Sequence, residues 1–310
     1  MAVRTVVALR ALGLGDLLTA LPALRALARA YPGCRRILAA PNAIAPLALH
    51  AGAAESVRDT QPLTPLDPEL AGADLAVNLH GKGPESRRVL EATRPRRLIS
   101  FGGRGPKWRP DEHEVARWCR LLEESGIPAE PDDLDVAPPA IPVPRVAVGA
   151  TLIHPGAASG ARRWPVERFA TVARAEHAEG RHVVVTGGPE EIGLAESLGD
   201  LAALPRQALF AGRTDLIGLA GLVAAAGRVV CGDTGVAHLA TALRTPSVVL
   251  FGPTSLRRWG PPPDRPWHIA LWTGRTGNPH GDPPHVGLLE IEAVDVLAAL
   301  RQLPEARAAA

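Results

Sequence analysis

Apolar and polar positions alternate along this chain in two different rhythms. Short apolar runs are separated by longer segments in which leucines recur at helical spacing, as at Leu17, Leu21 and Leu24. Strands alternating with helices predict parallel sheets covered by helices on both faces. The first half predicts strands at residues 5–9, 36–40, 56–58, 74–79 and 97–101 and helices at 16–30, 44–50 and 112–124. The second half predicts strands at 151–153, 182–186, 228–231 and 247–251 and helices at 166–179, 191–198, 215–225, 236–243 and 292–302.

A proline-rich segment interrupts this alternation at residues 131–144. It holds five prolines, which stiffen and extend a backbone, so we interpret it as an interdomain linker. We therefore expect an α/β protein with two Rossmann-like, doubly wound parallel-sheet domains, at residues 1–140 and 141–310, that face each other across a cleft. The last helix is placed to pack back on the first domain. Dehydrogenases and epimerases share such an arrangement, so the motifs must decide the function.

Composition narrows the classes of function and the compartment. The net charge is only +2, which argues against nucleic acid as a partner. The three cysteines lie far apart, with neither a zinc spacing nor the even number of a disulfide framework, as in a reducing cytoplasm. The chain shows no signal-peptide pattern at its start and no apolar stretch of membrane-spanning length. We expect a cytoplasmic protein.

The first predicted strand leads into a glycine-rich turn, RALGLGD, at residues 10–16. Its last residue, Asp16, stands at the start of a helix and fits either an N-cap or a carboxylate that faces a ligand; the residues alone leave both open. A dinucleotide motif would require glycine at Leu18 and an acid after the second strand, where Pro41 and Asn42 stand. We therefore expect neither a nicotinamide nor a flavin cofactor.

The segment HPGAASGARRWP at residues 154–165 follows a predicted strand and precedes a helix, where parallel sheets bind ligands. Ser159 offers a hydroxyl, Arg162 and Arg163 are fixed cations, and the helix N-terminus adds partial positive charge. These groups suit a diphosphate. The alternative is a solvated basic loop anchored by Trp164, but the small residues before the arginines favour the anion site.

The segment TGGPEE at residues 186–191 ends another strand with two glutamates. A carboxylate there can accept two hydrogen bonds from a ribose diol. The alternative is that Glu190 and Glu191 only open a helix, where acids interact favourably with the helix dipole.

A third loop, CGDTGVAH at residues 231–238, ends a buried strand with an acid, a hydroxyl and a glycine. His238 falls one helical turn after Thr234, on the same face. The alternatives are that Asp233 is a helix cap and that His238 is a core histidine. The density of polar groups between apolar segments favours a ligand-binding role for both. The next strand ends in FGPT, which adds Thr254 to the same rim.

In this order, the segments GxGD, HPGA…RRWP, GGPEE, DTGxxH and FGPT resemble glycosyltransferase family 9, whose best-known members are ADP-heptose:lipopolysaccharide heptosyltransferases. The resemblance runs from residue 6 to about residue 259. It implies the GT-B fold and an inverting, metal-independent transfer of a heptose-like sugar from an ADP-linked donor to a hydroxyl of a glycan or metabolite. It implies no cofactor, because ADP-heptose is a substrate.

The resemblance also implies a role for each matched residue. Asp16 corresponds to the general base, and Arg162 stands where the family usually has a lysine that contacts the donor phosphates. The expected donor-binding residues are Ser159, Arg162, Glu191 (with Glu190 as the alternative), Asp233, Thr234, Gly235, His238 and Thr254. The expected acceptor-binding residues are Gly15, His80 and Lys82, in the part of the family that varies most.

Two other classes of function stay open from the residues. One is a catalytically inactive protein that binds sugar nucleotides, and the other is a nucleotide-sugar epimerase or hydrolase on the same scaffold. For a transferase we expect a nucleotide-sugar donor and a glycan or small-molecule acceptor as partners. We also expect a monomer that associates peripherally with the inner face of the membrane.

Overall fold

The computed structural model describes residues 4–304, and the chain packs into two units, residues 1–135 and 136–310. Residues 1–3 and 305–310, at the outer ends of the two expected domains, lie outside the described part. Each unit has a hydrophobic core of its own. The boundary between the units falls within the proline-rich segment.

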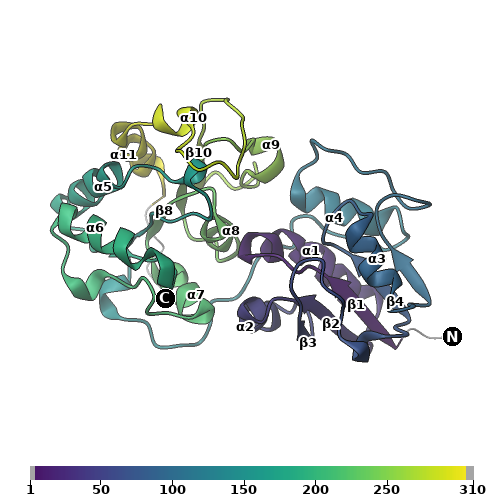
Figure 1. Cartoon of the computed structure of the whole chain (residues 1–310). Coiled ribbons are helices and arrows are strands. Elements are labelled where there is room, and N and C mark those ends of the chain that lie inside the picture. The colour runs from purple at the N-terminus through teal and green to yellow at the C-terminus, as the bar shows by residue number, and fades with distance from the viewer. Residues whose placement is uncertain (1–3, 305–310) are drawn as a thin grey trace. The chain divides into compact units, whose positions relative to one another are not determined.

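The first unit is built on a five-stranded parallel sheet in the order β3-β2-β1-β4-β5. Strands β1 to β4 of this sheet are labelled in Figure 1. Helix α1 lies on this sheet through leucines and alanines that recur at helical spacing, and Leu17, Leu21 and Leu24 are all buried. The strands are β1 (Thr5–Leu9), β2 (Arg35–Ala40), β3 (Ser56–Asp59), β4 (Leu75–Asn78) and β5 (Arg97–Ile99). The helices are α1 (Leu14–Ala30), α2 (Ala45–His50), α3 (Glu85–Glu91) and α4 (Glu114–Glu123).

The second unit repeats this design with a parallel sheet in the order β10-β9-β8-β6-β7. Its last helix, α11, adds Val296 and Leu300 to the core of this unit. The strands are β6 (Thr151–His154), β7 (Val183–Val185), β8 (Arg228–Gly232), β9 (Ser247–Leu250) and β10 (His268–Leu271). The helices are α5 (Val166–Ala178), α6 (Ile192–Ala202), α7 (Leu216–Ala225), α8 (Gly235–Ala242), α9 (Leu256–Trp259), α10 (Val286–Leu289) and α11 (Ala293–Gln302).

The strand order reverses beside the first strand of each sheet. Strands β2 and β4 flank β1, and strands β7 and β8 flank β6. The loops that leave such neighbouring strands diverge to opposite faces, and doubly wound sheets bind ligands in the crevice this leaves at the carboxyl ends. In the first unit this point lies between the loops after β1 and β4, and in the second between those after β6 and β8.

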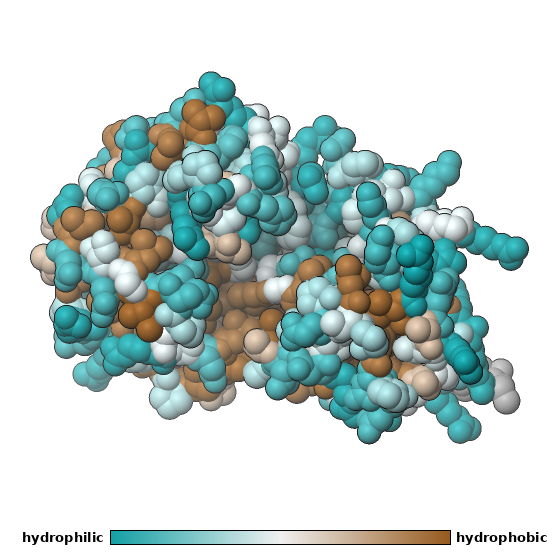
Figure 2. All heavy atoms as spheres, in the orientation of Figure 1, coloured by the Kyte–Doolittle hydropathy of each residue, from teal (hydrophilic) through white to brown (hydrophobic). Residues whose placement is uncertain are grey.

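The expected fold class, two Rossmann-like doubly wound parallel sheets, is confirmed. Within residues 4–304, every helix is too short or too polar to cross a bilayer. On the face shown in Figure 2, hydrophilic side chains surround and interrupt the apolar patches.

Candidate active site

The switch point of the second sheet brings a cation, a hydroxyl and a carboxylate together from two loops. Arg162 lies in the loop after β6, where its Nε is 3.5 Å from Ser159 Oγ. Its Nη1 donates to the carbonyl of Asp233, in the loop after β8, at 3.1 Å. Arg163, by contrast, is exposed and donates to the carbonyl of Ala157 at 2.9 Å. The structure thus fixes Arg162 across the switch point and leaves its neighbour at the surface.

The loop that carries Arg162 is covered by a later segment of the same unit. Ala161 N donates to the carbonyl of Gly281 at 2.9 Å, and Ser159 Oγ donates to the carbonyl of Pro279 at 2.5 Å. A Cβ on Gly160 would lie 1.5 Å from the carbonyl oxygen of Asp282, so only glycine allows this approach. The residues around 278–282 are therefore part of this site, and the sequence patterns did not single them out.

Asp233 is almost completely buried, with 5% of its surface exposed. Burial raises the pKa of its carboxyl above the ordinary value, while a hydrogen bond from Thr254 and the charge of Arg162 act in the opposite direction. Both of these residues come from other loops of the same rim. The carboxyl of Asp233 therefore interacts with Thr254 and Arg162, two residues that the sequence motifs also place at this rim.

Thr234 and Gly235 begin helix α8 directly after Asp233. His238, one turn further along, packs its ring against Trp259 in an edge-to-face contact with centroids 5.6 Å apart. Trp164 is buried in the core, as expected of an anchor, and its Nε1 donates to the carbonyl of Ile291 at 2.9 Å.

Glu191 lies beside His154, at the ends of the two strands β7 and β6. Its Oε2 accepts from the backbone N–H of Gly188 at 2.8 Å and lies 3.8 Å from His154 Nε2. Burial lowers the pKa of His154 despite the opposing charges of Glu191 and Glu190, so the ring favours its neutral form. A Cβ on Gly156 would lie 1.8 Å from Glu191 Oε1. Glu191 thus fits closely into the site, whereas Glu190 is exposed.

The switch point of the first sheet holds Asp16 in an ionic contact. Helix α1 begins at Leu14 after an N-cap at Gly13, so Asp16 is the third helical residue and the N-cap interpretation is wrong. Arg10 Nη2 lies 3.0 Å from Asp16 Oδ1 and 3.1 Å from Glu114 Oε1. The arginine is 1% exposed and stacks over the ring of Trp118 at 4.7 Å. A buried cation therefore orients the Asp16 side chain.

His80 follows β4 at the same switch point. Asn78 is buried, and its Oδ1 accepts from the backbone N–H of His80 at 3.1 Å. Burial and the charge of Arg10 both lower the pKa of His80. Gly15 lies in the first turn of α1, and Lys82 is exposed in the loop before α3. The structure therefore brings Asp16 and His80 to one cation, and among the described residues it gives Lys82 no such contact.

Sequence patterns missed Arg10 and Glu114 as members of this site. A signal existed for Arg10, since it is charged and directly follows an apolar strand. Glu114 lies 104 residues further along, and its contact with Arg10 is set by tertiary packing. Across residues 4–304, no group of three or more His, Cys, Asp or Glu side chains is arranged to hold a metal ion.

Two doubly wound sheets with polar loops at their carboxyl ends give a two-domain α/β protein with the architecture of the GT-B class. The model of glycosyltransferase family 9 (heptosyltransferase) matches residues 106–276, more than half of the chain, and the chain belongs to this family. This confirms the resemblance expected from the motifs.

Individual relatives agree with this membership. Lipopolysaccharide heptosyltransferase 3 of Escherichia coli is 31% identical over 161 residues, which cover 49% of this chain and 46% of the relative. The chain spans about half the length of the curated relatives it matches. The crystal structure of the family 9 glycosyl transferase from Veillonella parvula is 18% identical and covers 97% of both chains with a TM-score of 0.74. The structure of the E. coli heptosyltransferase WaaC with ADP is 18% identical, with a TM-score of 0.72 over 96% of this chain and 99% of that one.

Proposed function

We propose that this chain is an inverting, metal-independent glycosyltransferase that moves a heptose-like sugar from ADP-heptose to a hydroxyl of a glycan or metabolite. Family membership supports the transfer of a heptose, and ADP is the nucleotide held by the structurally similar WaaC. The observation that carries the proposal is the cluster of Arg162, Ser159 and Asp233 at the switch point of the second sheet.

The donor half of the mechanism follows from the charge that develops as the glycosidic bond breaks. The leaving ADP gains negative charge on its diphosphate, which preorganised donors and cations stabilise. We assign this role to Arg162, Ser159 and the first amides of α8, after Thr234 and Gly235. Arg162 is held in place by the carbonyl of Asp233, so little reorganisation is needed during the reaction.

The sugar and the ribose require hydrogen-bond acceptors beside the diphosphate. We assign Asp233, Thr254 and His238 to the donor sugar and diphosphate. Glu191, fitted beside Gly156, is assigned to the ribose diol in preference to the exposed Glu190.

The acceptor half requires a base that removes a proton from the attacking hydroxyl. We assign this role to Asp16, whose carboxylate is oriented by Arg10. Glu114 also pairs with Arg10 and balances part of its charge. Gly15, His80 and Lys82 are assigned to acceptor binding. In this proposal, residues 1–140 serve the acceptor and residues 141–310 the donor.

We further propose that the enzyme works in the cytoplasm as a monomer, without a cofactor, and meets a membrane-bound acceptor at the inner face of the membrane. Light scattering after size exclusion tests the monomer. Co-sedimentation with vesicles tests the peripheral association, and activity retained in EDTA tests metal independence.

Calorimetric titration with ADP tests the donor site through Arg162→Ala. Hydrogen bonds to charged groups contribute about 1.5–3 kcal/mol, so we expect ADP affinity to fall roughly 10-fold to 100-fold. Arg163→Ala is the matched control, since it removes the same charge one residue away and should leave ADP affinity within about twofold. An equal loss in both variants, or none in Arg162→Ala, would contradict the assigned donor site.

A further inference from the structure

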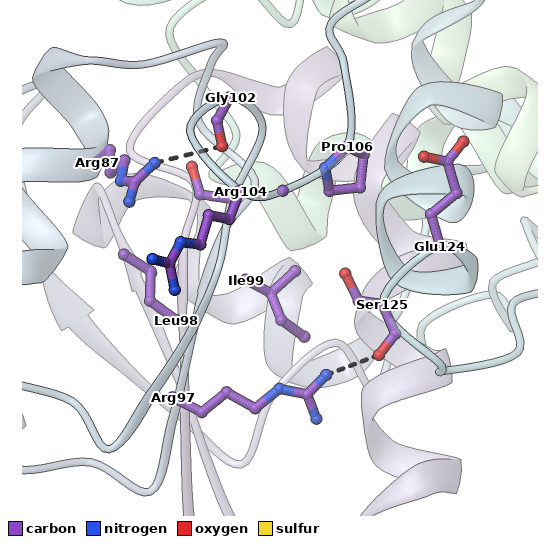
Figure 3. A pocket seen from close by; sticks show the side chains of 11 residues that line it. Arg87, Arg97, Leu98, Ile99, Gly102, Arg104, Pro106, Glu124 and Ser125 are labelled. Carbon is purple, nitrogen blue, oxygen red and sulfur yellow. Dashed lines mark hydrogen bonds between the residues drawn. The ribbon is translucent and has the colours of Figure 1, made fainter.

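A cavity of about 560 Å³ lies along the outer edge of the first sheet, apart from the site at its switch point. It is bounded by edge strand β5, by the loop at residues 100–106 and by Glu124 and Ser125, after the end of α4 (Figure 3). This volume is in the range of small-molecule sites, about 300–1,000 Å³.

Three arginines surround this cavity, and among residues 4–304 two of them have no acidic partner. The side chain of Arg97 donates to the carbonyl of Ser125 at 2.7 Å (Figure 3). Arg104 is exposed, and within residues 4–304 its side chain makes neither an ion pair nor a hydrogen bond. Arg87 pairs with Glu91 at 2.7 Å and donates to the carbonyl of Gly102 at 3.3 Å.

The acid at the rim does not balance these charges. Glu124 Oε1 is 3.0 Å from Arg120 Nη1 and 3.6 Å from Arg109 Nη2, so its charge is directed away from the cavity arginines. The cavity therefore carries net positive charge on a chain of almost balanced composition. Guanidinium groups that line a cavity suit an oxyanion, because each can donate two parallel hydrogen bonds to it.

A chain of hydrogen bonds joins this cavity to the region of Asp16. Ser100 lies on the cavity wall, and its Oγ accepts from Asn78 Nδ2 at 3.0 Å. The Oδ1 of Asn78 in turn accepts from the backbone N–H of His80. Strand β5 is two strands from β1, a separation of roughly 10 Å at the usual spacing. One or two sugar units can bridge such a distance.

We propose that this cavity binds a phosphate group carried by a sugar of the acceptor glycan, one or two units from the reacting hydroxyl. Arg97 and Arg104 contact the phosphate, and Arg87 closes the rim. The identity of the ligand as acceptor rests on the proposed function, but the phosphate site itself does not.

Titration calorimetry on the full chain, saturated with ADP so that the donor site is filled, tests the site directly. The probes are glucose 6-phosphate, glucose and inorganic phosphate. We expect glucose 6-phosphate to bind more tightly than inorganic phosphate, and glucose not to bind. Arg104→Ala should weaken glucose 6-phosphate binding roughly 10-fold, Arg104→Glu should abolish it, and Arg104→Lys should retain part of it.

Arg35→Ala, an exposed arginine at the start of β2, is the matched control and should bind as the parent does. An equal loss in Arg104→Ala and Arg35→Ala, or no binding of glucose 6-phosphate to the parent, would overturn the proposal. Phosphate binding equal to that of glucose 6-phosphate would overturn the assignment to a sugar. Because ADP binding is measured in the same preparations, failure of this site is distinguishable from failure of the donor site.

Discussion

At the scale of single residues, Asp233 has a carboxyl group that is almost wholly removed from water. Because burial raises its pKa, the folded chain binds a proton at this position more tightly than the unfolded chain does. The cost to the free energy of unfolding is therefore present at neutral pH and is relieved as the pH falls through the folded-state pKa. Arg162 and Thr254 offset part of this cost.

We expect Asp233→Asn to raise the melting temperature at neutral pH while it impairs donor use. Asparagine keeps the shape and an oxygen for Thr254 but removes the desolvated charge; each kcal/mol gained adds about 2–4 °C for a unit of this size. Asp215→Asn is the control, since it caps α7 at an exposed position and asparagine caps equally well. Thermal melts and transfer rates test this prediction. A less stable variant with unchanged turnover would refute the assignment of Asp233 to the donor site.

At the scale of elements, apolar runs predicted nine strands close to their observed positions, because buried parallel strands need continuous apolar residues. Strand β10 was missed: it is short, lies at an edge and follows a proline-rich loop, so its pattern is weak. Helix α3 was missed because Glu85–Glu91 is mostly polar.

The candidate site was likewise predicted from the sequence only in part. Arg162, Asp233 and Glu191 could be found from sequence because each follows an apolar strand. The contacts between these loops, the cover at residues 278–282 and the pairing of Arg10 with Glu114 join distant parts of the chain, and local patterns do not encode such contacts.

Strand β10 supplies a test of stability against pH. His268 is buried, its Nδ1 lies 2.9 Å from Ser247 Oγ, and burial with the charges of Arg265 and Arg244 lowers its pKa to about 4. The unfolded chain takes up a proton near pH 6.5, so stability should fall between pH 6.5 and about 4, by up to about 3 kcal/mol from this group.

Urea denaturation at pH 7.5 and pH 5 measures this contribution. We expect His268→Asn to lose less stability on acidification than the parent, while the exposed His177→Asn behaves as the parent does. An unchanged pH dependence in His268→Asn would show that the buried ring does not titrate as described. His80 and His154, whose pKa values are also lowered, should keep part of the dependence in every variant.

At the scale of the whole molecule, each unit has its own core and its own switch point, and the proposed reaction divides between them. The diphosphate charge is assigned to the second unit and the base to the first. In this proposal donor binding depends on the second unit alone, whereas transfer depends on both units. A single substitution in the first unit can therefore impair sugar transfer and leave donor binding unchanged.

The most direct test is Asp16→Asn in the full chain, assayed with ADP-heptose and a glycan extract from cells that lack the gene. Asparagine retains an oxygen for Arg10, so we expect an unchanged fold and ADP affinity but transfer slowed roughly 100-fold or more, the scale of general-base loss. For the parent, mass spectrometry should show heptose added to the glycan, and NMR should show an inverted anomeric centre. Transfer by Asp16→Asn at the parent rate, or a parent that releases only free heptose and ADP, would contradict the account.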